Sequence, residues 1–183
     1  MNNPKYLEIE DYLYTGIIIV NYAREHDDLI LKTLIEANIN MNISIFYEKG
    51  NTLKTLKELT YNIGNIGVEV SKAGENRQDI DIAMYTYNDA KYIRKEIQIE
   101  GEEIYFLYIY LSIFSKDKKE LEYNLDKIET ILQSKGLQTR RANFRQEQLF
   151  LSCLPLAENS EDLKKVAKRN ILTKGLVCTY PFI

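Results

Sequence analysis

The residues of this chain that could carry out chemistry do not combine into a familiar catalytic arrangement. His26 is the single histidine, so a site that needs two imidazole groups cannot form. The sequence has no Cys-x-x-Cys motif of the kind that binds structural zinc. It also has no glycine-rich loop ending in Gly-Lys-Ser/Thr, whose backbone amides would hold phosphates. Ser152 and Cys153 have no histidine base apart from His26. We therefore expect no catalytic residue, no metal ligand and no cofactor in this chain.

Three pairs of acidic residues deserve a separate test, because metal-assisted hydrolysis can rest on paired carboxylates. Such carboxylates must converge in one pocket, and the pairs here fall near predicted helix starts or in a loop. Acids in the first turn of a helix have a structural role, since they complement the helix dipole. One hypothesis for the function is therefore a small hydrolase. It requires Asp79 and Asp81 to line one cleft. The pairs are Asp27 and Asp28, Asp79 and Asp81, and Glu102 and Glu103.

Two local clusters of basic residues could contact phosphate groups. The first consists of Lys135, Arg140, Arg141 and Arg145, and the second of Lys164, Lys165, Lys168 and Arg169. The second cluster would lie on one or two helical turns, where binding to nucleic acid would weaken steeply with salt. A solvated helix face is the simpler interpretation in a chain of net charge −3. Interleaved aromatic residues and a recognition helix, which favour nucleic-acid binding, do not accompany this run. We therefore keep nucleic-acid binding through the second cluster as an alternative hypothesis for the function of this chain.

Length and composition predict an intracellular protein with a sizeable core. A chain of 183 residues suits one domain. Its longest apolar run, residues 104–111, is far shorter than the roughly 20 residues that cross a bilayer. The N-terminus, residues 1–5, lacks the basic-then-apolar pattern of a secretion signal. Cys153 and Cys178 stand in apolar surroundings, and we expect both to be reduced and buried.

Hydrophobic patterning predicts alternating strands and helices. Residues 104–114 are apolar on both faces and are expected in the centre of a sheet, followed by a helix over 117–135 that Gly136 ends. Residues 11–22 form a second strand of this kind. Between these two strands we expect a helix over 29–38 capped by Asp27 or Asp28, a half-exposed strand at 41–47 and a helix over 53–63 ended by Gly64 and Gly67. A short edge strand at 66–70 and a helix over 76–99 follow. After the helix over 117–135 we expect an edge strand at 137–142, a helix from Asn143 to Leu154 that carries Phe144 and that Pro155 ends, a short basic helix at 162–170 and a strand at 175–182.

This order of elements predicts an α+β fold. Residues 11–63 and 104–154 each read as strand, helix, strand and helix. Placing the two strong strands side by side gives a ferredoxin-like arrangement of two β-α-β units, with helices on one face of a mostly antiparallel sheet of about four or five strands. We expect a two-layer sandwich forming a single domain over 1–183. Residues 51–103 would be a helical insertion between the halves, and 157–183 a C-terminal extension.

The last forty residues resemble a known family. Residues 143–156 read NFRQEQLFLSCLPL, a glutamine-containing helix that runs into an apolar-Ser-x-Leu-Pro-Leu stop. A basic segment ending in threonine follows at 169–173, and an aromatic-Pro-Phe ending follows at 179–182. These features resemble the large assembly ATPases of type IV secretion systems, found in conjugative plasmids and transposons. With the strand and helix at 104–136, the resemblance covers about 80 residues.

The resemblance implies that this chain is the N-terminal, non-catalytic domain of such an ATPase. The RecA-like motor is missing, and the sequence stops at 180–183, just where the family continues towards it, so we expect a longer parent protein. ATP and magnesium are then expected only for the motor. The implied partners are inner-membrane components of the secretion channel and other copies of the parent ATPase, in a hexamer or a dimer. The implied location is cytoplasmic and peripheral, at the inner face of the cell membrane, where the motor powers conjugative DNA transfer.

Overall fold

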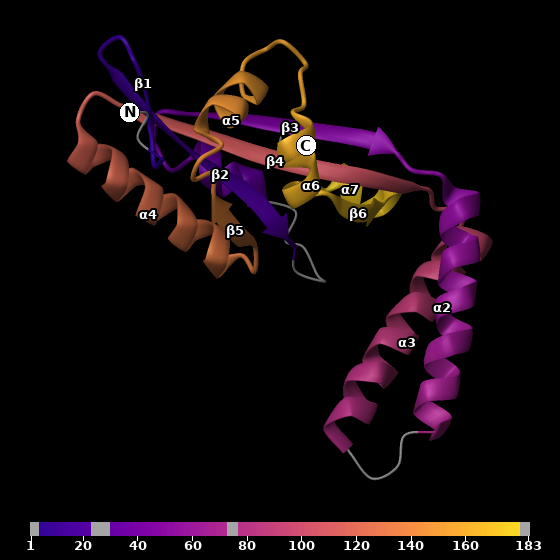
Figure 1. Ribbon diagram of the computed structural model, residues 1–183. Coiled ribbons are helices and arrows are strands. Elements are labelled where there is room, and N and C mark those ends of the chain that lie inside the picture. Colours follow the sequence, from indigo (N-terminus) through magenta and orange to yellow (C-terminus); the bar gives the residue numbers. More distant parts are fainter. Residues whose placement is uncertain (1–3, 23–29, 73–76, 180–183) are drawn as a thin grey trace. The chain divides into compact units, whose positions relative to one another are not determined.

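The computed structural model describes residues 4–22, 30–72 and 77–179. The chain divides into two compact units, one formed by Met1–Glu48 with Phe106–Ile183 and the other by Lys49–Tyr105. The first unit contains a sheet with helices, and the second contains a pair of long helices (Figure 1). Each unit is described separately below.

The sheet is centred on two long strands, β2 (Tyr12–Asn21) and β4 (Ile104–Ser115). They pair antiparallel, with Ile17 opposite Leu111. Two short strands, β1 (Leu7–Ile9) and β5 (Gln138–Arg141), also pair antiparallel with β2. On the other side, β3 (Met41–Lys49) lies beside β4, and β6 (Arg169–Leu172) pairs with β4 as well. The predicted α+β class and mostly antiparallel sheet are confirmed, with the two apolar strands adjacent as expected.

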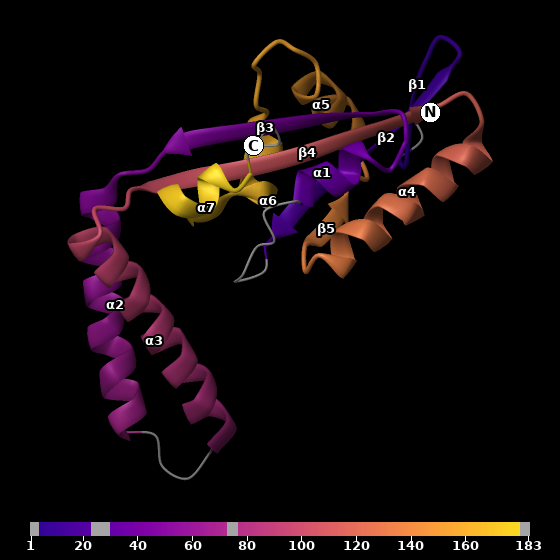
Figure 2. The ribbon, with the colours of Figure 1, turned by 180° about the vertical axis from the view of Figure 1, so that it is seen from behind.

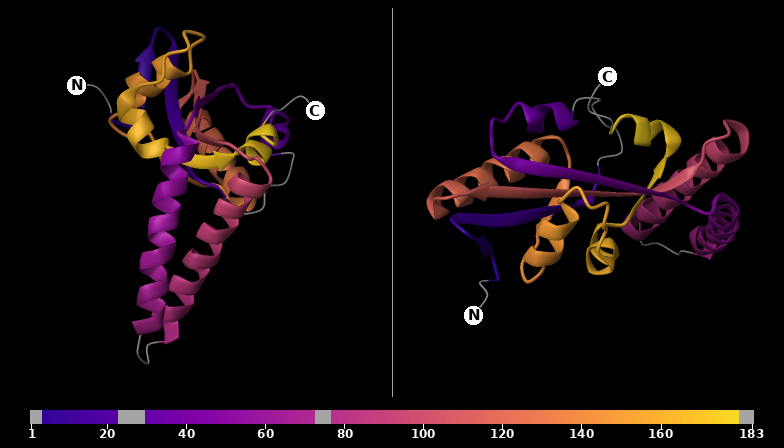
Figure 3. Two further views of the ribbon diagram at one scale, coloured as in Figure 1. Left: turned by 90° about the vertical axis from the view of Figure 1, so that its right-hand side faces the viewer. Right: turned by 90° about the horizontal axis from the view of Figure 1, so that it is seen from above.

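Helices cover both faces of the sheet, which accounts for central strands that are apolar on both sides. Successive side chains of a strand point to opposite faces, so Ile17 and Ile18 belong to different core clusters. The cluster of Ile17 packs against α4 (Lys118–Ser134) and α1 (Ile30–Ile35). The cluster of Ile18 packs against α5 (Gln146–Ser152) and α6 (Glu161–Ala167). Figure 2 and the right-hand view of Figure 3 show these layers. The expectation of helices on one face alone was wrong.

The ends of α4 form as the sequence predicts. Asp117 caps its first turn, where the carboxylate accepts a hydrogen bond of 3.0 Å from the Glu120 amide. Gly136 has a φ of 75°, the left-handed conformation that favours glycine after a helix. The Leu137 amide then donates to the Leu132 carbonyl at 2.9 Å, which closes the helix and directs the chain into β5.

The second unit is a hairpin of two helices, α2 (Thr52–Lys72) and α3 (Arg77–Ile99). The predicted helix over 76–99 is confirmed. The predicted end of the preceding helix at Gly64 and Gly67, and the edge strand at 66–70, were wrong, because α2 continues through both glycines. A glycine weakens a helix by about 1 kcal/mol, and packing along α3 outweighs that amount.

Four further expectations near the ends of elements need correction. Helix α1 covers 30–35 rather than 29–38, and its proposed caps, Asp27 and Asp28, lie outside the described residues. Helix α5 begins at Gln146 rather than after Asn143, because Phe144 has a φ of 64° that no helix allows. A strand was expected at 175–182, but residues 173–177 form a short helix, α7 (Thr173–Val177), and Leu176 packs on the core. Residues 180–182 of that expected strand lie outside the described residues. The predicted basic helix at 162–170 ends at Ala167, and β6 follows.

Candidate functional site

Three hydrogen bonds fix the N-terminal segment 4–6 over the start of β2 and of α5. The Lys5 carbonyl accepts from the Thr15 hydroxyl at 3.0 Å and from the Gln146 side-chain amide at 2.9 Å. The Pro4 carbonyl accepts from the Phe144 amide at 2.9 Å. Thr15 and Gln146 are buried, and buried polar groups need such partners. The segment is therefore part of the folded surface, with Tyr6 held in place on it.

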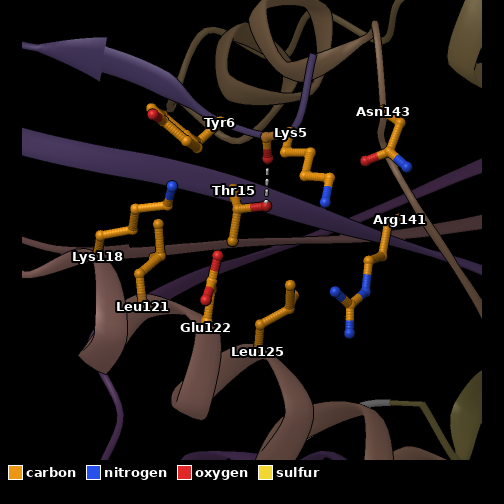
Figure 4. Close-up of a pocket in the computed structure, with 9 residues that line it drawn as sticks. All are labelled: Lys5, Tyr6, Thr15, Lys118, Leu121, Glu122, Leu125, Arg141 and Asn143. Atoms are coloured by element: carbon orange, nitrogen blue, oxygen red, sulfur yellow. Dashed lines mark hydrogen bonds between the residues drawn. The ribbon is translucent and has the colours of Figure 1, made fainter. Parts of the chain in front are cut away.

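A cavity of about 210 Å³ lies between this segment and α4 (Figure 4). Its floor contains the buried side chains of Leu121 and Leu125, from one face of α4. Figure 4 shows the Lys5, Glu122 and Arg141 side chains extending into the space above this floor. The residues that line the cavity are Lys5, Tyr6, Thr15, Lys118, Leu121, Glu122, Leu125, Arg141 and Asn143.

Three cations, Lys5, Lys118 and Arg141, line this cavity, and two of them are held in fixed positions. The Arg141 guanidinium binds Glu129 with contacts of 3.0 and 2.6 Å, and Asp126 with one of 2.6 Å. The hydrogen bonds that Arg141 donates to Glu129, followed by the one to Asp126, raise the pKa of Arg141. The Lys118 ammonium lies 5.3 Å from the centre of the Tyr6 ring, within range of a cation–π contact.

A second, smaller cavity of about 160 Å³ also has Tyr6 in its lining. It is lined by Pro4, Tyr6, Leu7, Phe144, Gln146, Glu147 and Gln148. Phe144 stands out because its side chain is 83% exposed and its backbone has a positive φ. We call the two cavities together with Tyr6, which lines both, and Phe144, which lines the second, the Tyr6 surface.

Sequence reasoning missed Phe144, which was expected on the buried face of a helix. One sequence signal does point to its exposure. A residue on a buried helix face normally has apolar neighbours three and four positions later. For Phe144 those positions hold Glu147 and Gln148.

The basic cluster proposed for nucleic-acid contact is divided among different partners. Lys164 lies 2.8 Å from Glu48 and 3.0 Å from Glu161, and hydrogen bonds to these carboxylates raise its pKa. Lys168 lies over the Phe106 ring, 3.7 Å from its centre. The exposed Lys165 lies 3.5 Å from Asp162, and Arg169 donates to the Lys168 carbonyl at 2.6 Å. Contact of Lys164, Lys165, Lys168 and Arg169 with nucleic acid stays a prediction.

Two buried tyrosines of β4 attach the neighbouring elements to the sheet. The Tyr108 hydroxyl donates to Glu48 at 3.0 Å, and burial together with this bond raises the pKa of Tyr108 to about 12. The pKa of Glu48 is lowered, chiefly by the hydrogen bond from Lys164. The Tyr110 hydroxyl donates to Asn159 at 2.8 Å. These contacts have a structural role, because each joins β4 to β3 or to the segment before α6.

Asp79 and Asp81, which were considered for catalysis, both fall in α3, and Asp81 is exposed. Cys153 is a buried free thiol whose pKa burial raises to about 12, so it carries no thiolate at neutral pH. His26 lies outside the described residues. Within residues 4–22, 30–72 and 77–179, no group of three or more His, Cys, Asp or Glu side chains could hold a metal ion.

The structure is an α+β fold with two cavities that Tyr6 helps to line. Residues 77–160 match the CagE, TrbE, VirB family, a component of the type IV transporter system. The matched residues extend from α3 to Ser160 and include Asn143–Leu156, so the predicted relationship to type IV secretion ATPases is confirmed. A comparison with curated proteins gave no match. None of the described helices is long and apolar enough to cross a membrane.

Proposed function

We propose that this chain is a non-catalytic docking and assembly domain of a conjugative-transfer ATPase, which binds inner-membrane components of a type IV secretion channel. The observation that carries the proposal is the match of residues 77–160 to a family of type IV transporter components. The matched range also includes Phe144, the exposed aromatic residue of the Tyr6 surface. Exposed aromatic side chains support a docking role, since they contribute large contact areas at low entropic cost.

The proposal also covers location and energy supply. The domain acts in the cytoplasm, peripherally at the inner face of the membrane, and is held there by its partners and by other copies of the parent ATPase in a hexamer or a dimer. ATP and magnesium bind to the motor domain of the parent protein, which drives DNA transfer. This chain positions the motor at the channel.

Two measurements on the purified chain test this function. The chain should hydrolyse no ATP above the background of a buffer control. It should co-purify with detergent-solubilised membranes that contain the inner-membrane channel proteins, and it should not co-purify with membranes that lack them. ATP turnover at a rate typical of an enzyme, about 1 per second or more, would contradict the non-catalytic role. Equal retention by both membranes would contradict the docking role.

The alternative function, nucleic-acid binding through the second basic cluster, has less support. Lys164 and Lys168 already contact Glu48, Glu161 and the Phe106 ring. The same preparation distinguishes the two functions, because phosphate contacts make binding to DNA fall steeply as salt rises.

A further inference from the structure

Position 144 is occupied by a residue that weakens the fold. Left-handed backbone is unfavourable for a bulky side chain such as that of Phe144, whereas glycine or asparagine adopts it readily. Burial of the ring does not compensate, because the side chain is 83% exposed. The backbone is nevertheless held in this conformation. The Phe144 amide donates to Pro4, and the Arg145 amide donates to the buried Ala142 at 2.8 Å. A phenylalanine here is explained better by contact with another molecule than by folding.

The adjacent cavity indicates what that molecule carries. Its lining includes the cations Lys5, Lys118 and Arg141, whereas Glu122 is its one carboxylate. Thr15 and Asn143 add polar groups. Arg141 is already bound to Asp126 and Glu129, so the positive charge left in the lining comes from Lys5 and Lys118 against Glu122. This small excess favours an anionic group. The volume of about 210 Å³ is below the roughly 300–1,000 Å³ of pockets that hold drug-sized ligands or cofactors. A single acidic side chain fits this space better than a nucleotide does.

The two cavities share Tyr6 as a common wall, so neighbouring residues of one chain can enter both. We infer that the Tyr6 surface binds an extended segment of a partner protein, with an apolar side chain against Phe144 and Tyr6 and an acidic side chain in the cavity above Leu121. In an extended segment, residues two apart lie about 6.5–7 Å apart on the same face. The inference rests on the proposed docking function and specifies the surface and the chemistry of the partner segment.

A short peptide tests this site directly. The probe is N-acetyl-Leu-Ala-Asp-amide, added at up to about 10 mM to the ¹⁵N-labelled chain, because a ligand of this size binds with a Kd on the order of 1 mM. We expect amide shifts at Thr15, Asn143 and the residues after Phe144. The matched peptide ending in lysine should cause none. No shift with the aspartate probe, or equal shifts with both peptides, would overturn the inference.

Variants separate binding from folding. Phe144→Gly should raise the thermal midpoint of unfolding and lower the affinity for the aspartate probe at least about fivefold. Ala157→Gly is the matched control, because Ala157 is exposed with a φ of 55° and lines neither cavity. It should leave the affinity unchanged. Lys118→Glu should lower the affinity for the aspartate probe, and Glu122→Gln should raise it. Unchanged affinity in Phe144→Gly would remove Phe144 from the site.

The results also distinguish failure of this site from failure of the proposed function. If the chain co-purifies with the channel components but does not bind the peptide, the docking function is supported and this inference is wrong. If the peptide binds and co-purification fails, the site stands without that function. Phe144-dependent self-association, or binding to vesicles of anionic lipid with no peptide binding, would assign the surface to a different occupant and overturn the inference.

Discussion

At the scale of single residues, Gly16 shows how closely α5 packs on the sheet. A Cβ atom at this position would lie 2.3 Å from a methyl carbon of Leu149, which is too close for any real contact. Leu149 is buried in the cluster on the second face, so its side chain has little room to move. Gly16→Ala should therefore destabilise the chain by about 1–3 kcal/mol, measured by urea unfolding.

The control for Gly16 is a double-mutant cycle with Leu149→Ala. Removing the Leu149 methyl groups creates space for the new Cβ, so the alanine at position 16 should be far less harmful in the Leu149→Ala background. Additive effects of the two substitutions would show that the cost at position 16 comes from the backbone rather than from this contact.

Individual residues of the site were only partly predictable. Lys164 and Lys168 were recognised as cations, but their partners, Glu48 and Phe106, are distant in sequence. The cavity at Tyr6 was not predicted, because segments 4–6, 118–125 and 141–143 form it together. Spacing in the sequence gives no signal for a site of this kind.

At the scale of elements, α2 has room for a larger side chain at Gly64. A Cβ at Gly64 would have no atom within 4 Å, and the residue is exposed on the helix. Gly64→Ala should stabilise the chain by about 0.5–1 kcal/mol, because alanine loses less backbone entropy when the helix forms. The measurement is thermal unfolding followed at a helical circular dichroism band.

The matched control for Gly64 is Gly50→Ala, which adds the same methyl group where space is lacking. Its Cβ would lie 3.0 Å from the Ile104 carbonyl oxygen, a backbone atom that cannot rotate away. We expect this variant to be destabilised. Lower stability in Gly64→Ala would contradict a regular, exposed helix at that position.

The success of prediction for each element depended on where its signals lie. Local signals determine α4, since Asp117 and Gly136 define its two ends, and the prediction was correct. The length of α2 depends on its packing with α3, and local sequence signals wrongly predicted an end at Gly64 and Gly67. The helix at 173–177 depends on packing Leu176 against the core, and local signals predicted a strand from residue 175. Tertiary packing overrode propensity in both cases.

At the scale of the whole molecule, two apolar strands predicted the centre of the sheet but not its complete covering. A strand that is apolar on both faces requires cover on both, and β2 and β4 receive it from α1 and α4 on one face and from α5 and α6 on the other. The apolar pattern on both faces correctly predicts the central position of the two strands. The same pattern also requires a second layer of helices, which the prediction of helices on one face lacked.

The helical hairpin can be removed without touching the core of the first unit. Among the described residues, neither core cluster includes a side chain from 49–105. The Gly50 amide donates to the Ile104 carbonyl at 2.8 Å, so the two ends of the insertion already meet. A variant in which an Asn-Gly link replaces residues 51–103 should unfold cooperatively and retain the near-ultraviolet circular dichroism of the buried Tyr108 and Tyr110. It should also bind the aspartate peptide as tightly as the intact chain does. Loss of the tyrosine signal together with binding of a hydrophobic dye would indicate a loosely packed state, and would show that the hairpin is required for the sheet to fold.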